Sequence, residues 1–377
     1  MRWLFAILTA ATMLLLALPT FGEEPNEALD GAYRSFVDAI PEDVTALLPS
    51  DLFSTDMDKV AEAAKEVSGF RWLVDRVLTL LGAELDGAVS LFGRLVAVLV
   101  IAALASLIKS AIGSEALSGA VDLCSSAAVV GSMLSLTGEA VTAVSGFFER
   151  LSALVNGMIP LTGVLLALGG NVNTAVVSGG GMMILLNVIE NLCAATLAPV
   201  VGVCIAIAVS DAFFGGGKLR GLGNFVKKVY VYFLGTVMLI LTFSLSVQTS
   251  LSAGADGVAM KSAKMLAGRA IPVVGGAVGD TLRTVAGSIV YLKSTVGAVG
   301  ILAVALVLLP PLCTVVLYRL GLIAASACAD LLGCSTEGKL LEAFVTVYGY
   351  LLAVMCICAV TTILLLTLFV KCSVAMA

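Results

Sequence analysis

The sequence contains no histidine, and only 12% of its 377 residues are charged. The absence of histidine removes the usual general base near neutral pH and the commonest ligand of transition metals. Soluble domains have about 25% charged residues, and a soluble protein of this size needs a polar outer layer. Hydrophobic residues instead make up 60% of the chain. The composition therefore indicates a membrane protein, because lipid removes the need for a polar surface.

Sequence motifs of catalysis and cofactor binding are also missing. We find no nucleophile elbow, no zincin motif and no glycine-rich loop that ends in Gly-Lys-Ser/Thr. The nine cysteines lie mostly in apolar runs, and Cys356 and Cys358 form a C-x-C pair that fits neither a zinc ribbon nor a redox motif. We interpret the cysteines as small apolar side chains. We expect no enzymatic activity and no cofactor, and the net charge of −5 argues against a nucleic-acid partner.

Residues 1–22 are typical of a secretory signal peptide. Arg2 supplies a charged start, residues 3–18 are apolar, and small residues lie around Pro19 and Gly22. A retained anchor helix is the alternative. In both cases we expect the segment that follows to lie outside the cytoplasm.

Residues 23–88 carry most of the negative charge of the chain. They contain fifteen acidic and five basic residues, whereas residues 89–377 contain eleven acidic and fifteen basic residues. Helices are predicted over residues 60–67 and 70–85, and the second has its apolar residues at helical spacing. We therefore interpret residues 23–88 as an acidic extracytoplasmic amphipathic region, and residues 89–377 as a multi-span membrane domain.

Eight apolar runs follow, and a membrane span needs about 20 apolar residues. Two of the runs flank Glu190 and Asn191, so this stretch forms either a hairpin or one broken helix. We expect six to eight spans in an all-α, polytopic integral membrane helical bundle with Pro/Gly-broken or re-entrant helices. The runs cover roughly residues 95–112, 121–138, 151–169, 175–189, 192–213, 229–250, 295–318 and 343–370.

Positive charge predicts the orientation of the bundle. Four basic residues between positions 218 and 228 place this short loop in the cytoplasm. Five apolar runs precede the loop, and an odd number of crossings from an outside start agrees with that side. The segment 251–293 is also basic, with a net charge of +3, yet the same counting puts it outside. We interpret it as surface-lying or re-entrant amphipathic helices, and its side of the membrane stays open.

Proline and glycine mark several candidate helix breaks. Glycine-rich stretches at 169–171, 179–181 and 215–217 are compatible with irregular backbone that lines water and with close helix packing. Two proline pairs recur at an offset of 112 residues, which is compatible with a weak internal repeat of about 121–228 and 233–340; duplicated halves of this kind are typical of transporters. Chance recurrence of prolines explains the offset equally well. The candidate breaks are Pro160, Gly163, Pro199, Pro272, Gly275, Pro310 and Pro311.

Acidic residues within or at the ends of the apolar runs are candidates for function. Ionised carboxylates are costly in lipid, so such residues face a cavity, a partner or the membrane interface. Glu190 is the best candidate for a transport residue, because Asn187 and Asn191 lie beside it on a helix. Glu139 and Asp211 are further candidates, and an interfacial or packing role is the alternative for all of them.

Three stretches carry a family resemblance. They are residues 256–280 (DGVAMKSAKMLAGRAIPVVGGAVGD), residues 292–300 (LKSTVGAVG) and the span that contains the Pro-Pro pair at 310–311. Together they resemble the stage III sporulation protein AE family of endospore-forming Firmicutes. The order of signal segment, acidic region and multi-span body also fits, and the resemblance is sharp across roughly residues 155–320.

The resemblance implies a permease-like, integral-membrane component of a mother cell-to-forespore channel, a specialised secretion or feeding-tube complex required for endospore formation. It would lie in the mother-cell membrane around the forespore. Its implied partners are other stage III sporulation channel-complex proteins, including the associated ATPase and forespore-facing subunits, and lipid. The alternative is a stand-alone secondary transporter with Glu190 as its coupling acid. The candidate partner surface consists of Asp256, Lys261, Lys264, Arg269, Asp280 and Arg283.

Overall fold

The computed structural model describes residues 25–45, 49, 59, 62, 63, 67, 70–112, 115–211, 220–270 and 275–371. These residues are almost entirely helical, and six of the resulting helical stretches are long and apolar enough to cross a membrane. This confirms the prediction of an all-α, polytopic membrane protein. The predicted signal segment lies outside the described residues.

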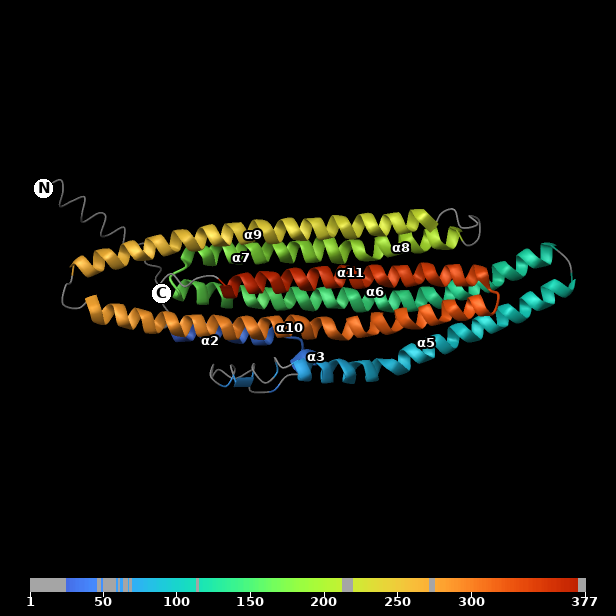
Figure 1. Cartoon of the computed structure of the whole chain (residues 1–377), viewed down its shortest axis with the longest axis horizontal. Coiled ribbons are helices and arrows are strands. Elements are labelled where there is room, and N and C mark those ends of the chain that lie inside the picture. The colour runs from blue at the N-terminus through green and yellow to red at the C-terminus, as the bar shows by residue number, and fades with distance from the viewer. Residues whose placement is uncertain are drawn as a thin grey trace.

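Two short N-terminal helices precede a bundle of long ones. Figure 1 shows the long helices side by side along one axis, with α9 next to α7 and α8, and with α11 and α6 between them and α10. The helices are α2 (Pro25–Asp38), α3 (Glu42–Thr45), α5 (Phe70–Ile112), α6 (Glu115–Leu168), α7 (Val172–Asn187), the π-helical η2 (Val188–Ala194), α8 (Ala195–Ser210), α9 (Arg220–Ala270), α10 (Gly275–Leu331) and α11 (Ser335–Lys371).

Eight apolar runs give six spans because two pairs of runs join into single helices. The runs 121–138 and 151–169 both belong to α6, and the runs around Glu190 form one continuous stretch through α7, η2 and α8. The sequence allowed either a hairpin or one broken helix around Glu190, and the structure has the broken helix. Three spans now precede residues 218–228 instead of five runs. The number of crossings is still odd, so the predicted side of that loop is unchanged.

Two tight turns reverse the chain between spans, and each needs a glycine in the left-handed conformation. Gly170 has φ 78° and Gly333 has φ 75°. At the first turn, the Asn171 N–H donates to the Leu166 carbonyl at 2.9 Å, and the Gly170 N–H donates to the carbonyl of Ala167 at 2.9 Å. The same pair of bonds recurs after α10. These are Schellman caps, which satisfy the last carbonyl groups of a helix.

The segment 251–293 differs from its prediction. Instead of surface-lying or re-entrant helices, residues 251–270 continue α9 and residues 275–293 begin α10. The physical reason is local: Ala, Met, Leu and Lys dominate residues 259–267, and such residues prolong an existing helix at little cost. The two helix ends lie at the same end of the bundle as the turn between α6 and α7 (Figure 1).

The described parts of region 23–88 belong to the bundle or pack on it, whereas most of the predicted helix 60–67 lies outside the described residues. The predicted boundary at residue 88 falls inside α5, which continues without a break. The unpredicted helix α2 packs on α6, where Tyr33 and Phe36 are buried. A Cβ atom on Gly157 would lie 2.3 Å from Cβ of Ala39, so only glycine permits this approach.

The candidate helix breaks mostly lie inside continuous helices. Pro160 and Gly163 lie within α6, Pro199 within α8, and Pro310 and Pro311 within α10. Long membrane helices tolerate proline because neighbouring groups satisfy the freed backbone atoms. Gly275 is the first residue of α10, Pro272 lies outside the described residues, and the internal repeat remains a prediction.

Glycines set the closest helix contacts. A Cβ on Gly181 would lie 2.6 Å from the Leu245 side chain of α9, and one on Gly297 would lie 2.0 Å from Cγ2 of Val370 in α11. For the stretch 179–181, the structure therefore favours close packing over irregular backbone.

Candidate functional site

Glu190 lies in η2, close to the midpoint of the span Val172–Ser210. Single π-helical turns within α-helices are frequent at functional sites. The Glu190 side chain is exposed on the outside of the bundle, as are Asn187 and Asn191. The Asn191 amide donates a hydrogen bond to Oδ1 of Asn187 at 3.2 Å. The π turn thus presents a carboxylate and two amides at mid-span.

Glu190 and α6 together line a polar cavity of about 590 Å³. From α6, Glu149, Ser152 and Asn156 contribute polar side chains. Ser152 is 6% exposed, and its hydroxyl has no hydrogen-bond partner among the described residues. The remaining lining residues are Phe148, Ala153, Leu186 and Ala194. The cavity therefore combines two carboxylates, an amide and a hydroxyl, all of which can accept hydrogen bonds.

A tyrosine from α9 holds the π turn. The Tyr230 hydroxyl donates to the carbonyl of Leu192 at 2.9 Å, and the Thr196 hydroxyl contacts both groups. The Tyr230 ring packs edge-on against Tyr350 of α11, with centroids 5.7 Å apart. A π turn shifts the backbone hydrogen-bond register, and side-chain donors commonly satisfy carbonyl groups there. Tyr230 supplies such a donor from α9 and so connects η2 to that helix.

Asp256 lies inside the protein, although the sequence suggested a partner surface. It is 4% exposed, and its carboxylate faces the first turn of α7. The carboxylate accepts hydrogen bonds from the backbone and side chain of Asn173 at 3.2 and 2.8 Å, and from those of Thr174 at 2.9 and 2.7 Å. An anion at a helix N-terminus satisfies free N–H groups and opposes the helix dipole. Asp256 therefore caps α7 from α9.

The other predicted site residues are dispersed. Glu139 is exposed on α6, Asp211 is partly exposed directly after α8, and Lys261 is exposed on α9. Neither Glu139 nor Asp211 lines the polar cavity. For the remaining predicted partner residues, the structure describes only the backbone: Lys264 and Arg269 belong to α9, and Asp280 and Arg283 belong to α10.

Sequence reasoning missed the contribution of α6 to the cavity. Glu149, Ser152 and Asn156 recur at intervals of three and four residues, which places them on one face of a helix. That spacing at the start of the apolar run 151–169 was the available signal. Sequence reasoning also missed two buried charged residues. The Glu337 carboxylate accepts a hydrogen bond from Ser125 at 2.5 Å. The Lys293 ammonium lies over the Phe369 ring, 5.4 Å from its centroid.

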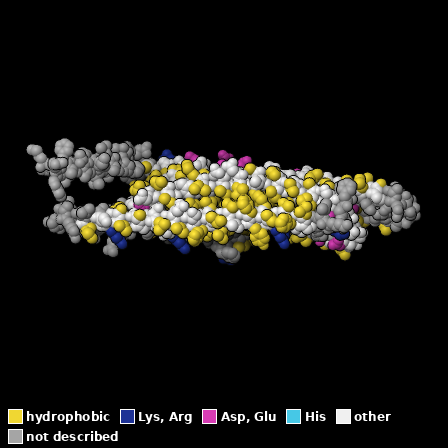
Figure 2. Space-filling model, turned by 90° about the horizontal axis from the view of Figure 1, so that it is seen from above, with side chains coloured by type: hydrophobic (Ala, Val, Ile, Leu, Met, Phe, Trp, Pro, Cys, Tyr) yellow, Lys and Arg dark blue, Asp and Glu magenta, His cyan; other side chains and the backbone are white. Residues whose placement is uncertain are grey.

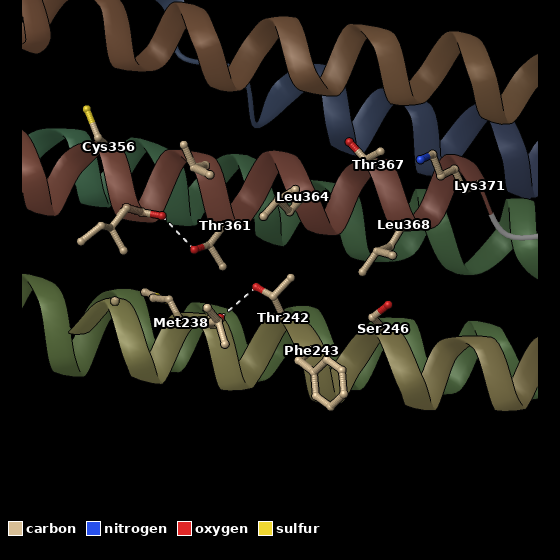
Figure 3. Close-up of a pocket in the computed structure, with 14 residues that line it drawn as sticks. Met238, Thr242, Phe243, Ser246, Cys356, Thr361, Leu364, Thr367, Leu368 and Lys371 are labelled. Atoms are coloured by element: carbon tan, nitrogen blue, oxygen red, sulfur yellow. Dashed lines mark hydrogen bonds between the residues drawn. The ribbon is translucent and has the colours of Figure 1, made fainter. Parts of the chain in front are cut away.

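A second large cavity, of about 680 Å³, lies between α9 and α11 and is mainly apolar (Figure 3). The hydroxyls of Thr242 and Thr361 donate to carbonyls of their own helices, at 2.9 and 2.8 Å. They are thus satisfied within the helices. Figure 2 shows hydrophobic side chains over the middle of the face that includes α9, with charged side chains mostly near its edges. These apolar surroundings suit lipid. Separately, no group of three or more metal-binding side chains occurs anywhere in the described part of the chain.

Comparison with known proteins identifies the family. The family model described as Stage III sporulation protein AE matches residues 53–374. The chain belongs to the stage III sporulation protein AE family. The match includes all six candidate spans, so a role in sporulation and a multi-pass membrane character apply to the same part of the chain.

One similar relative is the Stage III sporulation protein AE of Bacillus subtilis (strain 168), which is 26% identical over 153 residues. The aligned stretch covers 41% of this chain and 38% of the relative. No solved structure matches the chain.

Proposed function

We propose that this member of the family is the permease-like, integral-membrane component of the channel complex between mother cell and forespore. It would act in the mother-cell membrane and assemble with the other stage III sporulation channel proteins, including the ATPase and forespore-facing subunits. Family membership supports the sporulation role, and the six spans support a place within a membrane.

The outward-facing position of Glu190 supports an assembly component rather than a transporter. A secondary transporter binds its substrate near mid-membrane, between its own helices. Glu190 and Glu149 instead are exposed on the outer face of the bundle. Polar residues that face outward at mid-span need a further protein or water to cover them, because lipid satisfies neither their charge nor their hydrogen bonds.

Reconstitution separates the two functions. The purified chain alone in proteoliposomes is expected to move no solute, and Glu190→Gln is expected to have no transport phenotype in that preparation. Solute uptake driven by an ion gradient in the wild type, and its loss in Glu190→Gln, would support the stand-alone transporter instead. Glu139→Gln, which changes another exposed acid of the spans, is the matched control.

We propose that the end of α9 and the start of α10 form a docking surface for partner subunits. Lys261 is exposed in this part of α9, whereas the Asp256 carboxylate is buried and hydrogen-bonded to Thr174. Charge reversal by Lys261→Glu and Lys264→Glu is expected to weaken recovery of the complex without affecting membrane insertion. Unchanged recovery would rule out a contact through these charges.

A further inference from the structure

We infer that the apolar cavity between α9 and α11 binds one anionic phospholipid, whose acyl chains lie in the cavity and whose phosphate group meets Lys371. This inference rests on the membrane-spanning helices and not on the proposed function. It assigns a ligand to the cavity, and it turns the α9–α11 face toward lipid instead of toward a partner subunit.

The spacing of charges along α11 gives the depth of the cavity in the membrane. No charged residue lies between Glu342 and Lys371, and this stretch is roughly 42 Å long at 1.5 Å per residue. A bilayer with its headgroup regions is about 40–45 Å thick. Glu342 and Lys371 therefore lie at the two membrane surfaces, and the midplane falls near Cys356.

The cavity covers one leaflet of the membrane. On α11 its lining begins at Cys356 and ends at Lys371, which is roughly 22 Å along the helix and equals half of the bilayer. On α9 the lining runs over residues 235–246, within a stretch from 229 to 255 that also lacks charge. Figure 3 shows Cys356 at one end of the cavity and Lys371 at the other. The volume of about 680 Å³ is therefore distributed between the midplane and one membrane surface.

This extent fits a lipid and excludes a helix that crosses the membrane. Beyond the midplane, Tyr230 of α9 packs edge-on against Tyr350 of α11, with ring centroids 5.7 Å apart, and this contact closes the space between the two helices. A transmembrane helix of a partner crosses the whole hydrocarbon core of about 30 Å. An acyl chain, in contrast, ends at the midplane, where the cavity ends.

The interior of the cavity suits acyl chains. The hydroxyls of Thr242, Thr361 and Thr367 each donate to a carbonyl of their own helix, at 2.9, 2.8 and 2.8 Å. These groups therefore need no hydrogen bond from a ligand. Leu239 and Phe243, both 68% exposed in the isolated chain, provide apolar side chains along α9. A hydrocarbon chain requires nothing more, whereas a polar ligand would lose its hydrogen bonds to water here.

The headgroup end of the cavity carries a positive charge. Lys371 is exposed in the last turn of α11 and forms no ion pair with a described residue. Ser246 lies at the same end (Figure 3). The nearest acidic residue of α9, Asp256, already accepts hydrogen bonds from Asn173 and Thr174 of α7. A lysine at the membrane surface attracts anionic headgroups, so the charge and the apolar cavity together match an anionic phospholipid.

Photo-labelling of the purified full-length chain in a mild detergent tests this inference. The probe is phosphatidylglycerol with a photoreactive diazirine in one acyl chain, and mass spectrometry locates the labelled residues. We expect saturable labelling within residues 235–246 and 356–368. Unlabelled phosphatidylglycerol should compete at lower concentration than phosphatidylcholine, because the headgroup of the latter has no net charge.

Two variants test the two ends of the ligand. Lys371→Ala should weaken binding about fivefold, which corresponds to about 1 kcal/mol for one basic residue. Lys339→Ala, an exposed change near the opposite end of α11, should leave binding unchanged. Val360→Trp, at a lining residue that is 54% exposed, should fill the cavity and abolish saturable labelling. Ile240→Trp, at a residue that is 59% exposed outside the lining, is its control.

Several results would overturn the inference. They are labelling that does not saturate and spreads over all exposed apolar residues, equal competition by the two lipids, and unchanged affinity in Lys371→Ala or Val360→Trp. A photoreactive amino acid at Val360 that crosslinks to a protein segment in native membranes, and not to lipid, would likewise contradict it. Recovery of the chain with or without other sporulation proteins decides the proposed function separately.

Discussion

Asp256 illustrates how a single carboxylate connects two spans. The sequence drew attention to it as part of a distinctive stretch, but its partners, Asn173 and Thr174, lie more than 80 residues away. Nothing in the local pattern predicts such a pairing, because helical periodicity reports which face is apolar and not which helix end lies opposite. Glu190 was found from the sequence because an acidic residue inside an apolar run stands out whichever face of the helix it lies on.

Replacing Asp256 should weaken the attachment of α7 to α9. Asp256→Ala leaves buried N–H and hydroxyl donors without an acceptor, and we expect a loss of about 1–3 kcal/mol in the free energy of unfolding. Thermal unfolding of the detergent-solubilised protein measures the effect. Lys261→Ala, an exposed change on the same helix, is the control. Equal stability of the two variants would contradict the capping role.

Gly297 offers a test of helix packing with a built-in rescue. Gly297→Ala places a Cβ 2.0 Å from Cγ2 of Val370, so we expect a loss of about 1–3 kcal/mol from overpacking. Val370→Ala removes that methyl group and should restore most of the stability of the double variant. Gly131→Ala, where a Cβ meets nothing within 4 Å, should be neutral or slightly stabilising. Failure of the rescue in unfolding measurements would mean that α10 and α11 do not meet at this point.

At the scale of elements, the π turn is the clearest departure from regular helix. The sequence left a hairpin and a broken helix open for the stretch around Glu190, because apolar length alone fits both. The structure has one continuous stretch, in which Tyr230 satisfies the Leu192 carbonyl. Two other runs joined into α6 for a similar reason: Glu149 and Arg150 separate them in hydropathy, yet both residues are good helix formers.

Removing the Tyr230 hydroxyl should loosen η2 selectively. Tyr230→Phe loses one net hydrogen bond, worth about 1 kcal/mol, and keeps the ring against Tyr350. Hydrogen exchange followed by mass spectrometry should be faster in residues 188–194 than in α11. Tyr232→Phe, which is 74% exposed on the same helix, should change nothing. Uniformly faster exchange across the bundle would argue against a local role.

Helix α2 binds the bundle through Tyr33, and this gives a pH dependence. Burial raises the pKa of Tyr33 to about 12, against an ordinary value of 10. The folded protein thus favours the neutral phenol. Its contribution to stability is complete below pH 10 and is lost as the pH rises from about 10 to 12.

The difference in phenolate absorbance between wild type and Tyr33→Phe should reveal a group that titrates near pH 12. Displacing α2 with Gly157→Leu should bring this titration back toward pH 10, because the substitution clashes with Ala39. A Tyr33 titration near pH 10 in the wild type would mean that α2 is not docked.

At the scale of the whole molecule, composition and the apolar runs together were sufficient to predict the class of fold. The low charge and the long apolar runs predicted a polytopic helical bundle, and six spans confirm it. The number and joining of spans were less predictable, since they depend on which helices find partners in three dimensions. The position of the polar cavity was not predictable either, because it needs α6 and η2 to lie side by side.

Affinity purification of the tagged full-length chain from membranes of sporulating cells, in a mild detergent, tests the central claim most directly. The account predicts recovery together with other stage III sporulation channel proteins, in an assembly that survives the detergent. Recovery of the chain alone, as a monomer or homodimer, would contradict the account and would favour the transporter with Glu190 as its coupling acid.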